Sequence, residues 1–141
     1  MGNSQSSIQK LNFEDIQYII KNKENHLLIN TLNETDQRCL IKNTITAQQE
    51  VEIINRLIQS SNQQIKIVVY GPNCNDEKIY SRYNQLNSLG FYNVFIYVGG
   101  LFEWLLLQDI YGAQEFPTTS KTNDILKYKP NKTLNVHLLE F

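Results

Sequence analysis

Cysteine is scarce in this chain of 141 residues: there are two, Cys39 and Cys74, beside two histidines. Neither their number nor their spacing suits a disulfide framework or a structural zinc site, so we expect reduced thiols and neither metal nor cofactor. Charge of one sign is also lacking, since 13 Lys and Arg oppose 14 Asp and Glu, a net charge of −1. Without a broad positive field the chain is not expected to bind nucleic acid.

Long apolar runs are missing as well. The longest, Phe102 to Leu107, already contains Glu103, whereas a membrane span needs about 20 apolar residues. Residues 1–6 carry neither an apolar stretch nor a positive charge, so no secretory signal is expected and the predicted location is the cytoplasmic side. What the chain does have is 41% hydrophobic residues with 8 Tyr and 6 Phe, which is enough for one folded domain.

Hydrophobic periodicity predicts alternating helices and strands. Asn12 and Thr46 are the expected N-caps of two helices, because apolar residues recur at helical spacing after each. Compact apolar runs predict strands, and Gly90 ends a third helix. Strands that alternate with helices favour a parallel sheet covered on both faces. Of the four predicted helices, the first begins at residue 13, the second spans 47–59, the third carries Ile79 to Leu89, and the fourth spans 101–107. The predicted strands are 26–31, 39–41, 65–70 and 94–98.

The composition divides the chain into three parts. Residues 1–11 form a polar leader, residues 12–117 the compact domain, and residues 118–141 a linker with an apolar end. Beyond Pro117 the sequence is polar and has no apolar period, and alternation then returns near the C-terminus. We expect this tail to be buried, either on its own domain or on a partner. Its apolar residues are Leu134, Val136, Leu138, Leu139 and Phe141.

The second half of the domain carries a family resemblance. A strand ending at Tyr70 leads through a short loop and a helix to the strand 94–97, and then to Gly99-Gly100-Leu101-Phe102-Glu103-Trp104. This arrangement resembles the rhodanese-like domain family, and residues 28–32 and 40–44 match its first half more weakly. The resemblance implies a three-layer α/β/α domain with a five-stranded parallel sheet. On its own residues, Trp104 is expected in the core with Glu103 outside, and Gly99 and Gly100 in a sharp turn.

The nucleophile that the resemblance implies is missing. Active members of the family place a catalytic cysteine directly after the central strand, on a loop whose N–H groups face its sulfur. Here that position is Gly71. Asp76 stands at about the position where active members often carry an arginine. The loop equivalent to the active site consists of Gly71, Pro72, Asn73, Cys74, Asn75 and Asp76.

Cys74 lies in the same loop, three positions late, which keeps open a sulfurtransferase or persulfide carrier as the alternative function. Asp76 and Glu77 oppose that reading, because two carboxylates at the start of a helix disfavour a thiolate and repel oxyanions. The phosphatases that share the fold use a Cys-x-x-x-x-x-Arg loop, but the residue six beyond Cys74 is Tyr80. Cys39 is expected to be a buried apolar side chain.

Residues 1–6 match the N-myristoylation pattern, with Gly2 as the acceptor and Ser6 at the favoured position. One myristoyl chain binds membranes only weakly, and Lys10 is the sole basic residue among the first twenty. A stable anchor would therefore require a protein partner. Together these features predict a rhodanese-like domain without catalysis, serving as an interaction or structural subunit of a larger assembly. That assembly is left open between membrane-associated, cytoskeletal, ciliary and mitochondrial ones.

Overall fold

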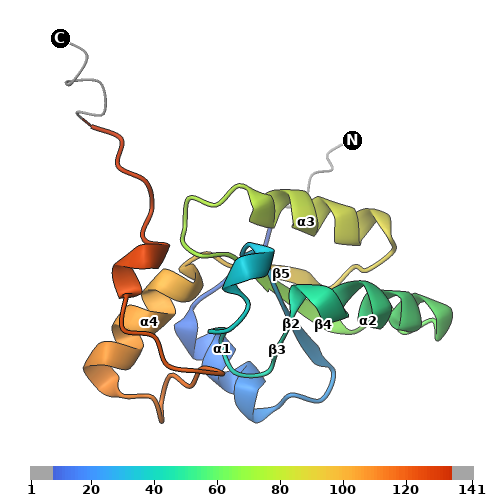
Figure 1. Cartoon of the computed structure of the whole chain (residues 1–141). Coiled ribbons are helices and arrows are strands. Elements are labelled where there is room, and N and C mark those ends of the chain that lie inside the picture. Colours follow the sequence, from blue (N-terminus) through green and yellow to red (C-terminus); the bar gives the residue numbers. More distant parts are fainter. Residues whose placement is uncertain (1–7, 135–141) are drawn as a thin grey trace.

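The computed structural model describes residues 8–134, so Gly2 and the tail residues beyond Leu134 lie outside the described part of the chain. Helices and strands alternate as the periodicity predicts (Figure 1). The elements are β1 (Lys10–Leu11), α1 (Phe13–Lys21), β2 (His26–Asn30), η1 (Glu34–Asp36), β3 (Thr44–Ile45), α2 (Ala47–Gln59), β4 (Lys66–Tyr70), α3 (Lys78–Ser88), β5 (Val94–Tyr97), α4 (Gly100–Tyr111) and η2 (Ile125–Tyr128).

The five strands form one sheet in the order β1-β5-β4-β2-β3. Every neighbouring pair runs parallel, and the three central strands are in register, with Ile29 beside Val69 and Val69 beside Ile96. A sheet of this kind is buried on both faces, which is why β4 reads as an uninterrupted apolar run. The five-stranded parallel sheet and the α/β architecture are therefore confirmed.

Alternation along β4 separates two hydrophobic cores. Val68 and Tyr70 face α1 and α4, whereas Ile67 and Val69 face α2 and α3. This follows from the period of two along a strand, which sends successive side chains to opposite faces. Figure 1 shows the resulting three layers, with the sheet between the two pairs of helices.

Two helices begin with the caps that the sequence predicts. The side chain of Asn12 accepts a hydrogen bond from the backbone N–H of Asp15, and the Asp15 carboxylate accepts one from the backbone N–H of Asn12. Thr46 and Gln49 form the same reciprocal pair at the start of α2. A reciprocal cap of this kind satisfies two backbone donors at the exposed start of a helix.

Three details of the predicted elements are wrong. The segment 39–41 is not a strand of the sheet; Ile41 forms only an isolated antiparallel bridge with Thr118. The third strand is instead Thr44–Ile45, which is too short to show alternation. The last helix is longer than the predicted 101–107; it spans Gly100–Tyr111 and ends at Gly112, which has positive φ.

Both predicted domain boundaries move outward. Lys10–Leu11, assigned to the leader, pairs with β5 as the edge strand of the sheet. Beyond Pro117 the chain packs back on the domain: the Thr119 amide donates to the carbonyl of Leu40 at 2.8 Å, and Tyr128 is buried in the core beside α4. Polar residues here bond to backbone groups of residues 38–40, so a polar composition does not mark a linker.

Candidate functional site

The loop Gly71–Asp76 lies at the carboxyl edge of the sheet. It joins β4 to α3, next to the segment that follows β2. After β2 the chain continues to β3 on one side, and after β4 it continues to β5 on the other, so this is the point where the strand order reverses. In open parallel sheets, ligands bind in the crevice at such a point. Topology therefore places the predicted loop at the expected binding position of the fold.

The space that a side chain on Gly71 would need is already filled by Asp76 and Thr31. A Cβ atom built on Gly71 would lie 2.5 Å from Oδ2 of Asp76 and 2.7 Å from Oγ1 of Thr31. Both distances are far below ordinary contact, and Gly71 itself is buried. A side chain at this position, including the cysteine that active family members carry, would require Asp76 to move.

The carboxylate of Asp76 points into the loop and is held there by two hydrogen bonds. Thr31 Oγ1 donates to Oδ2 at 2.7 Å, and the backbone N–H of Lys78 donates to Oδ1 at 3.1 Å. The side chain thus ties the end of β2 to the first turn of α3, where a negative charge is favourable. The sequence interpretation expected Asp76 to repel anions, but it did not predict that the carboxylate itself occupies the centre of the loop.

Cys74 is exposed on the loop, away from the position directly after β4. Its Sγ lies 3.8 Å from Oδ1 of the adjacent Asn75. Asn73 fixes the loop around it, because its Oδ1 accepts from the Asn75 amide at 2.9 Å and its Nδ2 donates to the carbonyl of Tyr128 at 2.9 Å. Cys74 is therefore a solvent-facing thiol on a braced loop.

The start of α4 packs directly onto the loop. The amides of Leu101 and Phe102 donate to the carbonyls of Gly71 and Pro72, at 2.9 and 2.8 Å. Gly100 has φ of +69°, and a Cβ on it would lie 2.6 Å from the Gly71 carbonyl oxygen. Only glycine allows both this conformation and this approach. The amides of Leu101 and Phe102 are consequently engaged by the loop and are not free for a ligand.

Trp104 and Glu103 of α4 are the next predicted positions after the loop. Trp104 is fully buried, and its Nε1 donates to the Pro117 carbonyl at 3.1 Å, which confirms it as a core residue. Glu103 was expected outside, but it is only partly exposed and accepts the Tyr97 hydroxyl at 2.5 Å. Burial, together with that bond, raises the pKa of Tyr97 well above its usual range. Tyr97 is thus a neutral donor, not an acid.

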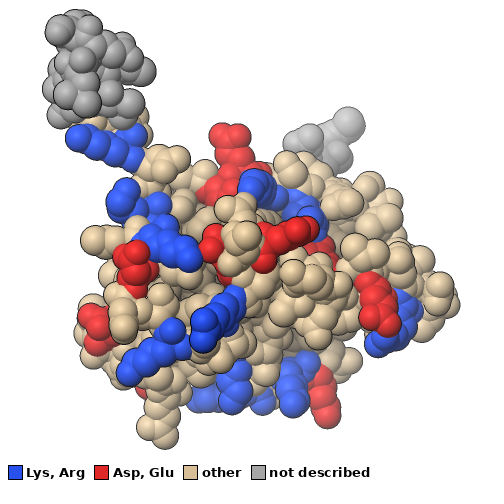
Figure 2. All heavy atoms as spheres, in the orientation of Figure 1, with Lys and Arg blue, Asp and Glu red and all other residues tan. Residues whose placement is uncertain are grey.

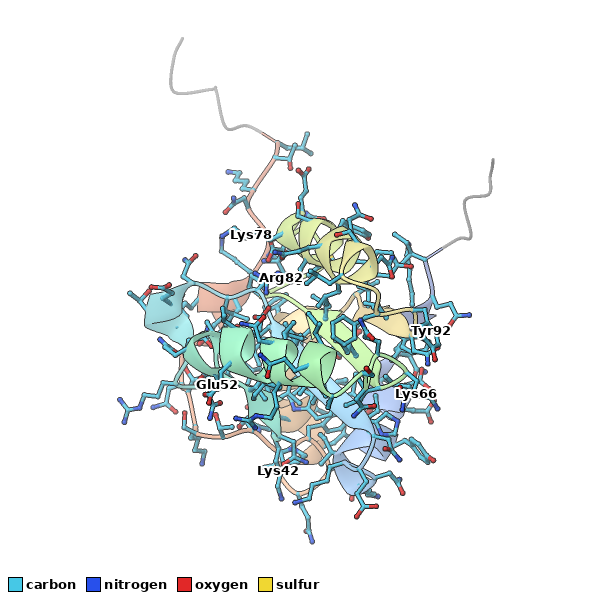
Figure 3. The ribbon with its side chains drawn as sticks, turned by 90° about the vertical axis from the view of Figure 1, so that its right-hand side faces the viewer. Lys42, Glu52, Lys66, Lys78, Arg82 and Tyr92 are labelled. Atoms are coloured by element: carbon cyan, nitrogen blue, oxygen red, sulfur yellow. The ribbon has the colours of Figure 1, made fainter. Side chains whose placement is uncertain are left out.

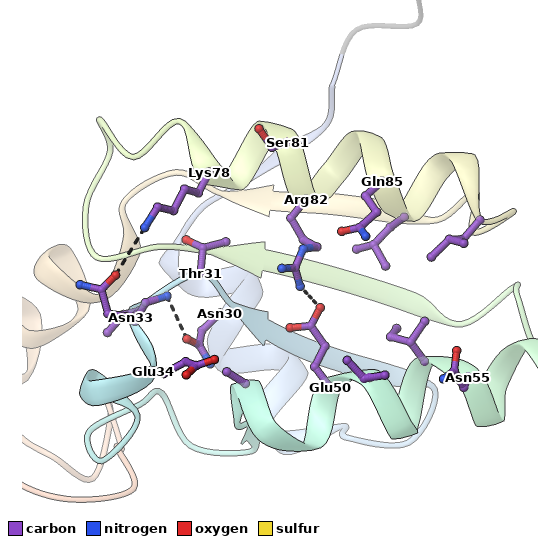
Figure 4. Close-up of a pocket in the computed structure, with 16 residues that line it drawn as sticks. Asn30, Thr31, Asn33, Glu34, Glu50, Asn55, Lys78, Ser81, Arg82 and Gln85 are labelled. Atoms are coloured by element: carbon purple, nitrogen blue, oxygen red, sulfur yellow. Dashed lines mark hydrogen bonds and ion pairs between the residues drawn. The ribbon is translucent and has the colours of Figure 1, made fainter.

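Two clefts meet beside the loop. The first, about 730 Å³, lies between α2 and α3 (Figure 4), and the Arg82–Glu50 ion pair crosses it. The second, about 500 Å³, lies over the loop itself. Sequence reasoning missed both, because their walls come from segments far apart in the chain. The residues common to the two clefts are Thr31, Leu32, Asn33 and Lys78.

One ion pair lies beside the loop. Lys127 contacts Asp36 at 2.9 Å at the rim of the second cleft, and this hydrogen bond raises the pKa of Lys127. On the face in Figure 2, basic and acidic side chains are interspersed. Within residues 8–134 no three His, Cys, Asp or Glu side chains gather as a metal site would require. No helix in that same range is long and apolar enough to cross a bilayer.

Cys39 and Leu134 are the remaining predicted positions that lie within the described chain. Cys39 is buried, with 4% of its surface exposed, as expected for a small apolar side chain. Leu134 is 77% exposed at the end of the described chain. Val136, Leu138, Leu139 and Phe141 of the predicted tail, and the predicted acceptor Gly2, lie outside residues 8–134.

Comparison with known proteins identifies the fold. No protein-family model matches the chain, and no curated protein matches it in sequence. Among solved structures, Ygr203w, a yeast protein tyrosine phosphatase of the rhodanese family, superposes with a TM-score of 0.61 at 14% identity, covering 85% of this chain and 97% of that one.

Two further structures agree. The rhodanese-like domain of Alr3790 from Anabaena gives a TM-score of 0.54 at 22% identity over 94% of this chain and 97% of that one. RDL2, a single-domain sulfurtransferase of Saccharomyces cerevisiae, gives 0.54 at 12% identity over 76% and 96%. At these identities the likeness establishes the fold and leaves activity open. The chain has a rhodanese-like fold, as the sequence resemblance implied.

Proposed function

We propose that this protein is a rhodanese-like domain that performs no group transfer at residues 71–76 and serves as an interaction or structural subunit. The observation that carries the proposal is the Asp76 carboxylate, which fills the space above Gly71. A sulfurtransferase needs a thiolate there, facing free N–H donors. Here residue 71 has no side chain, and the Asp76 carboxylate lies where the side chain of a nucleophile would begin.

An activity assay tests the catalytic half of the proposal. In sulfur transfer from thiosulfate, a thiolate attacks the outer sulfur, the S–S bond breaks and sulfite leaves; cyanide then removes the persulfide sulfur as thiocyanate. We expect thiocyanate formation by the full-length protein at the uncatalysed rate, and the same rate for Cys74→Ser. Turnover that disappears in Cys74→Ser would instead establish the alternative, a sulfurtransferase or persulfide carrier.

A gain-of-function pair tests the role of Asp76. Gly71→Cys alone is expected to form little persulfide, because the new side chain competes with the carboxylate for one space. Gly71→Cys combined with Asp76→Gly removes both the obstacle and the charge, and we expect persulfide, measured by mass spectrometry after thiosulfate treatment, to increase several-fold. Equal persulfide in both variants would contradict the proposed blocking role.

The interaction half is supported by the outer side of α4. The helix buries Leu101 and Leu105, yet Leu106, Ile110 and Tyr111 on its other side are 41%, 69% and 65% exposed. An exposed apolar patch of this kind is typical of a protein contact. The expected partner therefore presents an apolar surface to α4.

A matched pair of variants tests this surface. In a pull-down with mass spectrometry, Ile110→Glu is expected to lose a protein that the wild type retains, because the new charge would be buried in the contact. Tyr92→Glu is the control, since Tyr92 has the same 69% exposure on another part of the surface. The melting temperature should be unchanged in both. Equal recovery by both variants would contradict an interaction through α4.

Lipid attachment at Gly2 is a separate part of the proposal and rests on the sequence motif alone. We expect labelling by a myristate analogue in a eukaryotic host, and loss of the label in Gly2→Ala. Because a single acyl chain binds bilayers weakly, the labelled protein should exchange from vesicles. Unlabelled wild-type protein would contradict this part without affecting the reading of the loop.

A further inference from the structure

Four exposed lysines gather where α1 ends and where the chain enters β2, β3 and β4. Because neighbouring strands run parallel, these segments meet at the edge of the sheet opposite to residues 71–76. None of the four lysines forms an ion pair with another residue of the described chain. In Figure 3, Lys42 and Lys66 are labelled and lie on either side of α1. The lysines that form this basic patch are Lys21, Lys23, Lys42 and Lys66.

Contacts between the segments hold the basic patch together. Asn43 donates from Nδ2 to the carbonyl of Ile20 at 3.3 Å, so the chain before β3 touches the end of α1. The amide of His26 donates to the carbonyl of Lys23 at 3.3 Å, and His26 lies beside Lys66 in the sheet. The four lysines therefore belong to one continuous surface, although they come from three separate parts of the sequence.

The basic patch has a local excess of positive charge. Two carboxylates lie near it: Glu24 follows Lys23 in the chain, and Asp15 lines a small pocket of about 170 Å³ together with Lys66. Four lysines thus oppose two acidic side chains, within a protein whose net charge is −1. A local field of this kind can attract a negatively charged surface and orient the domain on it.

An exposed aromatic side chain accompanies the lysines. Tyr18 of α1 lines the same small pocket as Lys66 and is 61% exposed. Its ring packs edge-on against His26, with 6.2 Å between the ring centroids. Tyrosine is enriched at the boundary between headgroups and water, because its ring is apolar and its hydroxyl polar. Tyr18 is therefore suited to the surface of a bilayer.

Lysine without arginine favours a lipid surface over a protein as the partner. Protein interfaces are enriched in arginine and depleted in lysine. A lysine ammonium is a point charge on a flexible stem, which suits a layer of anionic headgroups without defined geometry. None of the three arginines of the chain, Arg38, Arg56 and Arg82, belongs to the basic patch.

We propose that the basic patch binds the surface of bilayers that contain anionic lipids. The domain then lies with the end of α1 on the headgroups and with residues 71–76 directed away from them. This inference goes beyond the proposed function, because it requires neither acylation nor a contact at α4. Leu11 lines the same small pocket as Lys66, so the leader that carries Gly2 joins the domain at the margin of the patch.

The basic patch also supplies the second signal that a single acyl chain needs for stable attachment. Gly2 precedes Leu11 by nine residues, which span at most about 32 Å, so an acyl chain on Gly2 can reach the bilayer on which the patch lies. This part alone rests on the proposed lipid attachment. A patch assembled by folding thus replaces the protein partner that the first twenty residues, taken alone, would require.

Sedimentation with vesicles tests the patch in the full-length protein made in bacteria, which do not attach the acyl chain. We expect binding to phosphatidylcholine vesicles that contain phosphatidylserine, and none to phosphatidylcholine alone. Lys23→Ala combined with Lys42→Ala should lower the partition coefficient about 25-fold, because each lysine contributes about fivefold. Raising the salt from about 0.05 to about 0.5 M should abolish binding, because the charges are then screened.

Lys129→Ala combined with Lys132→Ala is the matched control. Both lysines are exposed and the net charge changes by the same amount, but they follow η2. In Figure 1 the chain after η2 lies at the upper left, whereas α1 ends near the bottom. We expect unchanged binding to the anionic vesicles. The melting temperature should be the same for both double variants, because all four side chains are exposed.

Three results would overturn the proposal. An equal effect of the two double variants would assign the binding to net charge and not to the basic patch. Absence of binding to the anionic vesicles would leave the patch without a lipid partner. Tighter binding to soluble poly-glutamate than to the vesicles would assign the patch to an acidic protein. All of these measurements use unacylated protein, so they are independent of whether Gly2 is labelled.

Discussion

The contact between Gly71 and Asp76 makes a quantitative prediction about stability. In Gly71→Ala the new methyl group would lie 2.5 Å from the carboxylate of Asp76 and 2.7 Å from the Thr31 hydroxyl. Crowding of this kind costs about 1–3 kcal/mol. If Asp76 turns away instead, the bonds to Thr31 and to the Lys78 amide are lost, at a similar cost. Either response destabilises the fold.

A double variant distinguishes this crowding from other effects. Asp76→Gly alone should also cost about 1–3 kcal/mol, since it removes the hydrogen bonds and adds a flexible glycine. Gly71→Ala combined with Asp76→Gly should cost no more than Asp76→Gly alone, because the methyl group then enters the vacated space. The predicted coupling between the two positions is thus about 1–3 kcal/mol.

Differential scanning calorimetry measures the effect. For a chain of this length, 1 kcal/mol corresponds to about 3 °C in melting temperature, so Gly71→Ala should melt about 3–10 °C below the wild type. Thr31→Val is the control, because it removes the hydroxyl that bonds Asp76 and leaves the carboxylate in place. Strict additivity of the two single shifts, or an unchanged melting temperature for Gly71→Ala, would refute the placement of Asp76 in the loop.

Further predictions concern the residues around the loop. Gly100→Ala should cost about 1–3 kcal/mol more than Gly112→Ala by denaturant unfolding, because only at Gly100 does the new methyl group clash with the loop. Strain at positive φ, about 1–3 kcal/mol, is common to both variants. Equal costs would contradict the close approach. Tyr70→Phe should cost about 1–3 kcal/mol, because two buried bonds to its hydroxyl are lost, and a neutral result would contradict this. Burial raises the pKa values of Tyr70 and Tyr97, so the unfolded chain loses these protons at lower pH than the folded chain. Their contribution to stability should therefore be full below about pH 10 and fall above it. A melting temperature that stays constant up to about pH 11 would contradict this.

Local patterns were sufficient to predict most of the fold. The caps at Asn12 and Thr46 and the apolar run that ends at Tyr70 depend on neighbours within a few residues, and the structure confirms them. The strand Thr44–Ile45 could not be predicted, because two residues cannot display a period and its place is set by pairing with β2. The packing of Tyr128 depends likewise on contacts with the distant α4.

The sequence predicts where the candidate site lies in the fold, but not how its side chains are arranged. The strand, loop and helix around residues 71–76 define the carboxyl edge of the sheet, and Gly71 visibly lacks a nucleophile. The orientation of Asp76 depends on Thr31, which lies 45 residues away in the chain. The Arg82–Glu50 pair, too, joins separate helices across a cleft. No spacing rule in a single sequence relates such residues to each other.

An anion site at the end of a parallel strand requires donors that stay unsatisfied until the ligand arrives, and such donors reduce stability. Here the Thr31 hydroxyl and the Lys78 amide are bonded to Asp76, and two amides in the first turn of α4 are bonded to loop carbonyls. The Asp76 carboxylate can enter the loop only because Gly71 has no side chain. The missing nucleophile and the internal carboxylate are therefore two halves of one arrangement, in which a ligand-binding edge contributes to the stability of the domain.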